Sequence, residues 1–373
     1  MESQLLGAPA TLRRREGDRI VCTACARYCR LREGQIGLCG VRGVFGGELR
    51  LLVYGRVITG HIDPIEKKPV THYMPGTKIF SIATTGCNWL CAYCQNFDIS
   101  QRRKVEGIEA SPEKVVEMAL RYGSDGIAYT YNEPSIFMEY AHDIGVIARR
   151  KGLINIFVTN GYWTPDSVTN ASEFLECATV DFKGSGEREF VRKYIGIPDA
   201  EPVFQTLLEM KRRTKIHIEI TDLIVPEIGD NLDAARRLSR WVYENLGPET
   251  PIHFLRFHPD YKLLHLPWTP VETLEKHAKI AKEEGLLYVY IGNVPGHPLE
   301  NTYCPGCGQI VVERHGYDIL DWRLDQNNRC TNCGYAVHII GRPLAKRVSG
   351  RRRFIPVSLN MNHDTKLQRF NFL

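Results

Sequence analysis

Apolar residues in the middle of the chain form short continuous runs instead of alternating with polar ones. Seven such runs, rich in Val, Ile, Phe and Tyr, occur between residues 78 and 292. Strands that are buried on both faces have this pattern. The runs predict strands at 78–85, 125–131, 155–161, 178–184, 215–226, 251–259 and 286–292.

Segments with helical periodicity separate most of these runs. Several begin with a capping residue and a proline, as at Ser111 and Pro112, and several end at a glycine. Repeated strand and helix units build a parallel sheet with helices outside, which curls into a β/α barrel. We therefore predict an α/β fold with a partial (β/α) barrel, whose helices lie at 111–123, 133–152, 164–176, 201–213, 230–247 and 269–285.

Composition and charge limit the function classes. The chain has 373 residues, 43% of them hydrophobic, and a net charge of +5. It contains no long apolar run and no apolar segment after its basic start, so we expect no membrane span, no signal peptide, no membrane partner and a cytoplasmic location. Basic residues gather at 13–15 and 346–354, where they could contact nucleic acid. We favour a solvated terminus, and do not expect nucleic acid as a partner.

Cysteine is the informative residue type. Eleven of the twelve cysteines fall in three tight clusters, and in a reducing compartment such clusters indicate metal ligands more than disulfides. Only Cys177 stands alone, in an apolar run before the fourth predicted strand, and we expect a buried structural thiol there.

The first cluster has the spacing C-x2-C-x3-C-x9-C. Four thiolates within eighteen residues can close a tetrahedral site, and nearby glycines allow the turns. Zinc and an auxiliary iron-sulfur cluster both accept four cysteines, and spacing does not separate them. The residues of this module are Cys22, Cys25, Cys29 and Cys39.

The last cluster consists of two C-x2-C pairs, each in a turn that contains glycine. Two such knuckles joined by short strands form the zinc-ribbon pattern. Four protein thiolates leave no open coordination position, so we interpret the ribbon as a structural staple or docking module. Its expected zinc ligands are Cys304, Cys307, Cys330 and Cys333.

The middle cluster, GCNWLCAYCQN, has the spacing C-x3-C-x2-C and follows the first predicted strand. It therefore lies at the carboxyl ends of the strands, where β/α barrels carry their chemistry. Cys87, Cys91 and Cys94 could hold three irons of a 4Fe-4S cluster and leave the fourth iron open for a ligand from outside. The alternative is a structural metal site that His or water completes.

With an aromatic residue before the last cysteine, this motif resembles the signature of radical S-adenosylmethionine (radical SAM) enzymes. The resemblance implies two cofactors, a 4Fe-4S cluster and S-adenosylmethionine, which chelates the open iron. It also implies a one-electron donor such as flavodoxin or ferredoxin. Reductive cleavage then gives methionine and a 5′-deoxyadenosyl radical, which abstracts hydrogen from the substrate. The cofactors supply this chemistry, and no further catalytic residue is predicted.

The resemblance extends to other strand ends. YNEP after the second strand matches a Gly-Gly-Glu-Pro-like stretch only at Glu133 and Pro134, so we expect Glu133 to face the methionine amine. Thr159 and Asn160, in a TNG stretch, correspond to cofactor contacts of glycyl-radical activating enzymes. The alternative for Glu133 is a charge that complements a helix N-terminus.

Two further strand ends carry candidate groups. Asp181 and Lys183, in a D-x-K stretch, correspond to cofactor contacts in the same activating enzymes, and they lie two apart on a strand, so they point the same way and can pair. His258, at the end of the sixth strand, corresponds to a histidine near the adenosine. The alternatives are a structural ion pair for Asp181 and Lys183, and a structural histidine for His258.

Read in order, the motifs from about residue 20 to about residue 342 resemble the AmmeMemoRadiSam system radical SAM enzymes, relatives of pyruvate formate-lyase activating enzyme. This implies a protein or peptide substrate and Memo-like companion proteins. Modification of a small molecule or RNA, and a non-enzymatic binding protein stapled by zinc, stay open as alternatives. The loop 61–76 either lines the substrate entrance or is a solvated linker. We expect a flexible N-terminus at 1–19, a cysteine-rich module and linker at 20–76, the barrel at 77–297, the zinc-ribbon-like module at 298–342 and a basic tail at 343–373.

Overall fold

The computed structural model describes residues 7–343 and 355–357. Its main element is a nine-stranded sheet, in the order β16-β15-β14-β13-β12-β11-β9-β8-β20. Strands β9 and β11 to β16 run parallel, and β8 and β20 extend the sheet antiparallel at one edge. The expected α/β fold with a partial (β/α) barrel is confirmed, with a mainly parallel sheet that has antiparallel strands at one edge. The strands are β8 (Thr59–Pro64), β9 (Lys78–Ala83), β11 (Gly126–Tyr129), β12 (Ile154–Thr159), β13 (Cys177–Lys183), β14 (His217–Ile224), β15 (Ile252–Arg256), β16 (Val289–Gly292) and β20 (Ile355–Pro356).

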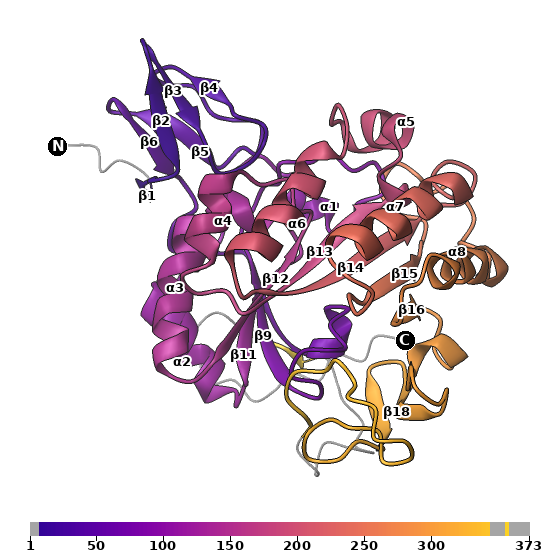
Figure 1. The fold of residues 1–373 in the computed structure, drawn as a ribbon. Coiled ribbons are helices and arrows are strands. Elements are labelled where there is room, and N and C mark those ends of the chain that lie inside the picture. Colours follow the sequence, from indigo (N-terminus) through magenta and orange to yellow (C-terminus); the bar gives the residue numbers. More distant parts are fainter. Residues whose placement is uncertain (1–6, 344–354, 358–373) are drawn as a thin grey trace.

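Six helices form a layer along this sheet (Figure 1). The capping residues act as expected, since the Ser111 hydroxyl accepts a hydrogen bond from the amide of Lys114 and the Thr164 hydroxyl accepts one from Ser167. The helices are α2 (Pro112–Arg121), α3 (Met138–Arg150), α4 (Pro165–Ala171), α6 (Glu201–Arg213), α7 (Leu232–Asn245) and α8 (Val271–Glu283). Shorter helical segments in the loops are η1 (Ile65–Lys67), α1 (Phe97–Ser100), η2 (Pro134–Phe137), η3 (Gly184–Gly186), α5 (Arg188–Phe190), η4 (Val191–Ile195) and η5 (Pro298–Glu300).

The apolar runs form the core because both faces of the parallel strands are covered. All four residues of β11 are buried, and so is Cys177 at the start of β13, among apolar side chains. The buried thiol expected at Cys177 is confirmed. No helix among residues 7–343 and 355–357 is long and apolar enough to cross a membrane.

The N-terminal module contains two small antiparallel sheets, with the orders β1-β6-β5 and β2-β3-β4. Residues 13–16 pair with residues 19–22 in a hairpin, so the flexible N-terminus that we expected up to residue 19 is wrong for residues 7–19. The basic residues at 13–15 are exposed on this hairpin. The strands are β1 (Ala8–Pro9), β2 (Arg13–Glu16), β3 (Arg19–Cys22), β4 (Arg30–Leu31), β5 (Arg42–Phe45) and β6 (Glu48–Leu51), and a separate pair joins β7 (Arg56–Val57) to β10 (Ile108–Glu109).

Two expected boundaries also differ from the structure. Strand β8 belongs to the main sheet, so the sheet begins before residue 77. Asp63, Lys68 and His72 are buried, and a solvated linker at 61–76 is therefore wrong. Most of the basic tail, including residues 346–354, lies outside the described residues, while residues 355–356 form β20.

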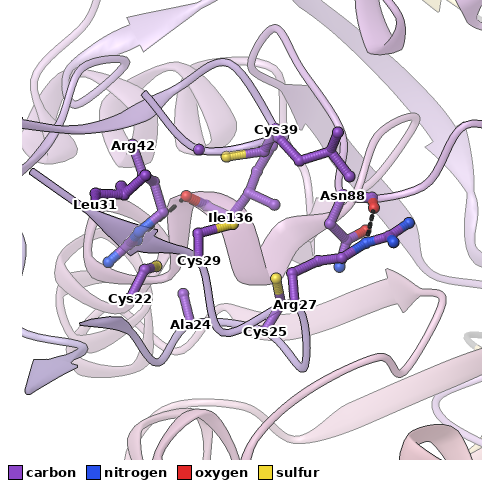
Figure 2. Close-up of a pocket in the computed structure, with 12 residues that line it drawn as sticks. Cys22, Ala24, Cys25, Arg27, Cys29, Leu31, Cys39, Arg42, Asn88 and Ile136 are labelled. Atoms are coloured by element: carbon purple, nitrogen blue, oxygen red, sulfur yellow. Dashed lines mark hydrogen bonds between the residues drawn. The ribbon is translucent and has the colours of Figure 1, made fainter. Parts of the chain in front are cut away.

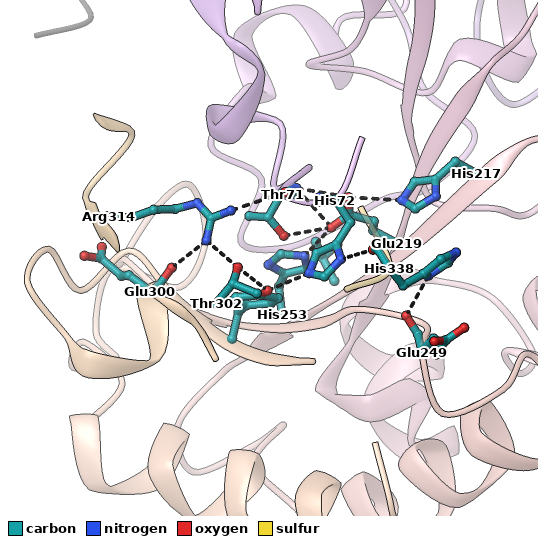
Figure 3. Close-up of polar contacts among 12 residues, drawn as sticks. Thr71, His72, His217, Glu219, Glu249, His253, Glu300, Thr302, Arg314 and His338 are labelled. Atoms are coloured by element: carbon teal, nitrogen blue, oxygen red, sulfur yellow. Dashed lines mark hydrogen bonds and ion pairs between the residues drawn. The ribbon is translucent and has the colours of Figure 1, made fainter. Parts of the chain in front are cut away.

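The C-terminal module has three antiparallel strands, β17 (Thr302–Tyr303), β18 (Ile310–His315) and β19 (Asp318–Trp322). A polar network fixes it to the amino ends of the barrel strands (Figure 3). Buried Glu219 of β14 accepts hydrogen bonds from Thr71 and from His253, at 3.0 and 2.8 Å. The ribbon contributes Arg314, whose guanidinium donates to the Thr71 carbonyl at 3.3 Å.

Candidate active site

The motif loop begins three residues after β9 and ends where α1 begins. Its three cysteines line a single cavity of about 340 Å³ at the carboxyl ends of the strands. Strands β11, β12 and β13 are in parallel register with β9 or with one another, so the residues that follow them meet at this edge. The structure thus brings together the expected site residues Cys87, Cys91, Cys94, Glu133, Asn160, Asp181 and Lys183 around one cavity.

The three thiols suit a cluster of several metal ions. Burial raises the pKa of Cys91 to about 12 and raises the pKa of Cys87 and Cys94 as well, so each thiol holds its proton at neutral pH until a metal replaces it. Among the described residues, only the ribbon cysteines bring three or more Cys, His, Asp or Glu ligand atoms within 4.8 Å of one another. The cysteines of the motif loop do not form such a compact single-ion group.

The two residues that replace the expected glycines hold the motif loop in place. Tyr131 has a φ of 68°, in the left-handed region that glycine favours, and its hydroxyl donates to Asp63 at 2.8 Å. The side-chain amide of Asn132 donates to the carbonyls of Thr84 and Gly86, at 2.8 and 2.9 Å. The backbone shape expected from a glycine pair is thus kept by other residues.

Glu133 is almost fully enclosed by donors. Its carboxylate accepts hydrogen bonds from the Thr159 hydroxyl and the Asn160 amide, both at 2.8 Å, and from the Trp163 indole at 3.0 Å. It also accepts a hydrogen bond from the Ser135 amide at 3.0 Å, and so caps the N-terminus of η2. This is the helix N-terminal role that we gave as the alternative for Glu133. Burial raises the pKa of Glu133, although these donors oppose the shift. Thr159 lies behind Glu133 and is not among the residues that line the cavity.

Asp181 and Lys183 form the expected pair, with 3.0 Å between the Lys183 ammonium and the carboxylate. Thr221 of β14 donates to the other oxygen of Asp181. Burial alone would lower the pKa of Lys183, but the charge of Asp181 outweighs it and the net shift is upward. Lys183 therefore stays a cation beside the three cysteines, and the pair presents both charge signs to the cavity.

His258 lies outside this group. Its side chain is 45% exposed, forms a hydrogen bond with Asp260 at 2.8 Å and packs edge-on against Trp268. The residues that line the cavity do not include it. The structure thus places His258 at the rim and not beside the cysteines.

Many residues of the cavity wall were missing from the expected site, and three of them carry polar groups that bear on its chemistry. Lys68 pairs with Asp63 at 2.6 Å, and burial lowers its pKa to about 8. Tyr131 lies beside it, with the Lys68 ammonium 4.6 Å from the centre of its ring. Tyr317 comes from the ribbon and lines the same cavity. The charged loop 61–76 pointed to Lys68, but no local pattern marks Tyr317, which reaches the cavity only through the packing of the ribbon.

The ribbon cysteines form a compact ligand set. The sulfurs of Cys304 and Cys333 lie 3.5 Å apart, and those of Cys307 and Cys330 lie 3.8 Å apart. A tetrahedron with Zn–S bonds of about 2.3 Å has edges of about 3.8 Å, so these residues fit a zinc ion. The four N-terminal cysteines line a second cavity, which is separate from the one described above.

Comparison with known proteins gives matches to both sequence and fold. A family model described as the radical SAM superfamily matches residues 81–242, which run from β9 into α7 and include the motif loop. The uncharacterized protein MJ0808 of Methanocaldococcus jannaschii is 42% identical over 328 residues, covering 87% of this chain and 97% of that protein. A domain of pyruvate-formate lyase-activating enzyme from Bacteroides vulgatus is similar to 46% of this chain over 100% of its own, with 14% identity and a TM-score of 0.40. Streptococcus suis SuiB bound to precursor peptide SuiA is similar to 61% of this chain over 51% of its own, with 10% identity and a TM-score of 0.46.

Proposed function

The chain belongs to the radical SAM superfamily, whose members bind a 4Fe-4S cluster and S-adenosylmethionine, and from this premise we propose the roles of its site residues. Cys87, Cys91 and Cys94 hold three irons of the cluster and leave the fourth for S-adenosylmethionine. The observation that carries the proposal is that these cysteines share one cavity with the ion pair of Asp181 and Lys183.

The polar residues of the wall bind and orient the methionine part of the cofactor. Lys183 attracts its carboxylate and Asp181 attracts its ammonium group, because the pair offers both charges 3.0 Å apart. Glu133 adds a second negative charge, and Thr159 fixes its orientation by donating to it. The bound cofactors supply a 5′-deoxyadenosyl radical that abstracts hydrogen from the substrate.

The substrate in this proposal is a protein or peptide, as in glycyl-radical activating enzymes. The order of motifs along the chain supports the AmmeMemoRadiSam group, with Memo-like companion proteins and a flavodoxin or ferredoxin as electron donor, in the cytoplasm. The wall also includes Lys68, Tyr131 and Tyr317, which come from the loop before β9, from the loop after β11 and from the ribbon. A wall assembled from three separate segments suits recognition of an extended chain.

The test uses the whole chain, purified and reconstituted without oxygen. Reduction in the presence of S-adenosylmethionine is expected to release 5′-deoxyadenosine and methionine. Replacing any one of Cys87, Cys91 and Cys94 by alanine is expected to abolish this release. Cys177→Ala is the matched control, since this cysteine is buried in the core away from the cavity. Full turnover in any of the three motif variants would rule out the assignment.

Two other functions are separated by further measurements. Deuterium from a labelled protein, small molecule or RNA enters 5′-deoxyadenosine only when that compound is the substrate. A binding protein stapled by zinc would contain zinc, no iron, and would release no nucleoside.

A further inference from the structure

The four N-terminal cysteines converge on a cavity between their module and the barrel (Figure 2). Cys22 ends β3, and the other three follow in the loops around β4. The barrel closes the cavity with Asn88 of the motif loop and with Ile136. Three of the four cysteines are buried, so the cavity is a shielded site and not a surface groove.

The spacing of the sulfurs argues against a single ion. In the ribbon all four sulfurs lie within 4.8 Å of one another, as a tetrahedron around zinc requires. The N-terminal sulfurs do not form such a group, although all four cysteines lie in the described part of the chain. In a 4Fe-4S cluster each thiolate binds a different iron and points outward from it. Its four sulfurs therefore lie farther apart than those around one ion.

The cavity wall also contains buried donors that lack acceptors. Nε of Arg42, Nη2 of Arg27 and Nδ2 of Asn88 have no hydrogen-bond partner within the described part of the chain, and all three residues line the cavity. Arg42 is 1% exposed and Asn88 is fully buried. Leaving such groups unpaired is unfavourable, and a bound group with acceptor atoms would offset that cost. A zinc site offers only its four thiolates as acceptors, whereas a cluster adds its inorganic sulfides, which also accept hydrogen bonds.

We propose that Cys22, Cys25, Cys29 and Cys39 bind a second 4Fe-4S cluster, held by four protein thiolates. The Arg27 guanidinium offsets part of its negative charge, whereas the charge of Arg42 is paired with Glu139. The unpaired donors of Arg27, Arg42 and Asn88 are available to its sulfurs. Four protein ligands leave no iron open, so this cluster does not bind S-adenosylmethionine. The inference depends on the N-terminal cavity alone and stands apart from the function proposed for the motif cysteines.

The decisive variant removes the motif cysteines and keeps the N-terminal ones. With Cys87, Cys91 and Cys94 all changed to serine, the reconstituted chain is expected to keep about four irons and four sulfides of the about eight in the unchanged protein. Mössbauer and electron paramagnetic resonance spectra should show a 4Fe-4S cluster that S-adenosylmethionine does not perturb. Zinc in place of this iron would overturn the proposal, and would leave the proposed function intact.

The converse variant, Cys25→Ser with Cys29→Ser, is expected to lose about four irons and to keep the signal that responds to S-adenosylmethionine. If either variant fails to fold, native mass spectrometry of the unchanged protein distinguishes a second cluster from a second zinc ion. About eight irons and one zinc support a second cluster, whereas about four irons and two zinc ions overturn it. If the motif variant lost no iron, the proposed function would fail while the second cluster would stand.

Discussion

Arg42 of the N-terminal module and Glu139 of α3 form a buried two-pronged ion pair. The two guanidinium nitrogens lie 2.6 and 2.7 Å from the two carboxylate oxygens. Glu139 also accepts hydrogen bonds from the amides of Thr11 and Leu12, at 3.0 and 3.1 Å. This one carboxylate therefore fixes β5 and the segment after β1 to the barrel, and it holds Arg42 against the cavity of the four cysteines.

Glu139→Gln is expected to destabilise the docked module by about 3 to 5 kcal/mol, because it leaves the buried charge of Arg42 without a partner. Faster amide hydrogen exchange in β1 and β5, with unchanged exchange in β14, is the expected readout. Glu283→Gln is the control, since its pair with Arg236 lies at the surface, where solvent screens the interaction. Equal effects of the two variants would mean that the pair does not dock the module.

The same carboxylate predicts sensitivity to acid. Burial alone would raise the pKa of Glu139, but Arg42 outweighs it and holds this pKa below its ordinary value of 4.5. The unfolded chain therefore takes up this proton first as the pH falls. The stabilisation is complete above pH 4.5 and is lost as the pH falls through the lower value of the folded state. Exchange in β1 and β5 should rise over this range, and Glu139→Gln should remove that part of the pH dependence.

Much of the fold was predictable, because each barrel element carries its own signal. Continuous apolar runs give strands whose faces are both covered, and Ser111 and Thr164 mark helix starts that the structure confirms. The errors lie in strand pairs outside the repeated strand and helix units, one a local hairpin and the other at the edge of the sheet. Residues 13–16 read as a solvated basic stretch, yet they pair with 19–22, and residues 59–64 pair with β9. A single charged stretch has no pattern that reveals its partner.

The candidate site also contains residues whose placement could be predicted from the sequence and residues whose placement could not. The placement of Glu133, Asp181 and Lys183 at the cavity was predictable, because each lies at or just after the carboxyl end of a parallel strand, and such ends meet at one edge. The placement of Tyr317 was not predictable, because this residue reaches the cavity from the ribbon. The contact between Arg314 and Thr71 fixes the ribbon to the barrel. His258 satisfied the rule for strand ends but turns toward Asp260. Position along the chain therefore gives the edge of the sheet, and packing decides which side chains face the cavity.

Lys183→Met is expected to weaken binding of S-adenosylmethionine about 10- to 100-fold, since a hydrogen bond to a charged group contributes about 1.5 to 3 kcal/mol. The iron content should not change, because Lys183 is not a metal ligand in the proposed site. Titration of the reduced protein, followed through the spectrum of the cluster, measures both quantities. Lys193→Met, on η4, is the control, and its binding should match that of the unchanged protein. Unchanged binding by Lys183→Met would make its pair with Asp181 structural.

Removing zinc with a chelator is expected to loosen the ribbon locally, because small metal modules fold with their metal. Hydrogen exchange should rise across residues 304–333 and stay unchanged in β12 and β13. The cavity should lose the part of its wall that Tyr317 supplies. If the ribbon stays protected from hydrogen exchange after complete loss of zinc, its own core and its contacts with the barrel are sufficient to keep it folded.

Gly86 links the two cysteine sites, and its replacement is expected to disturb both. It has a φ of 88°, and a Cβ atom there would lie 2.3 Å from the Cys39 carbonyl oxygen. Since neither backbone can yield without moving a ligand loop, Gly86→Ala should lower the iron content of both sites. Gly123→Ala is the matched control, because Gly123 has a φ of 62° but no atom within 4 Å of the added carbon. That variant bears only the backbone strain of about 1 to 2 kcal/mol and should keep its iron. Equal iron in the two variants would mean that the contact between Gly86 and Cys39 does not couple the sites.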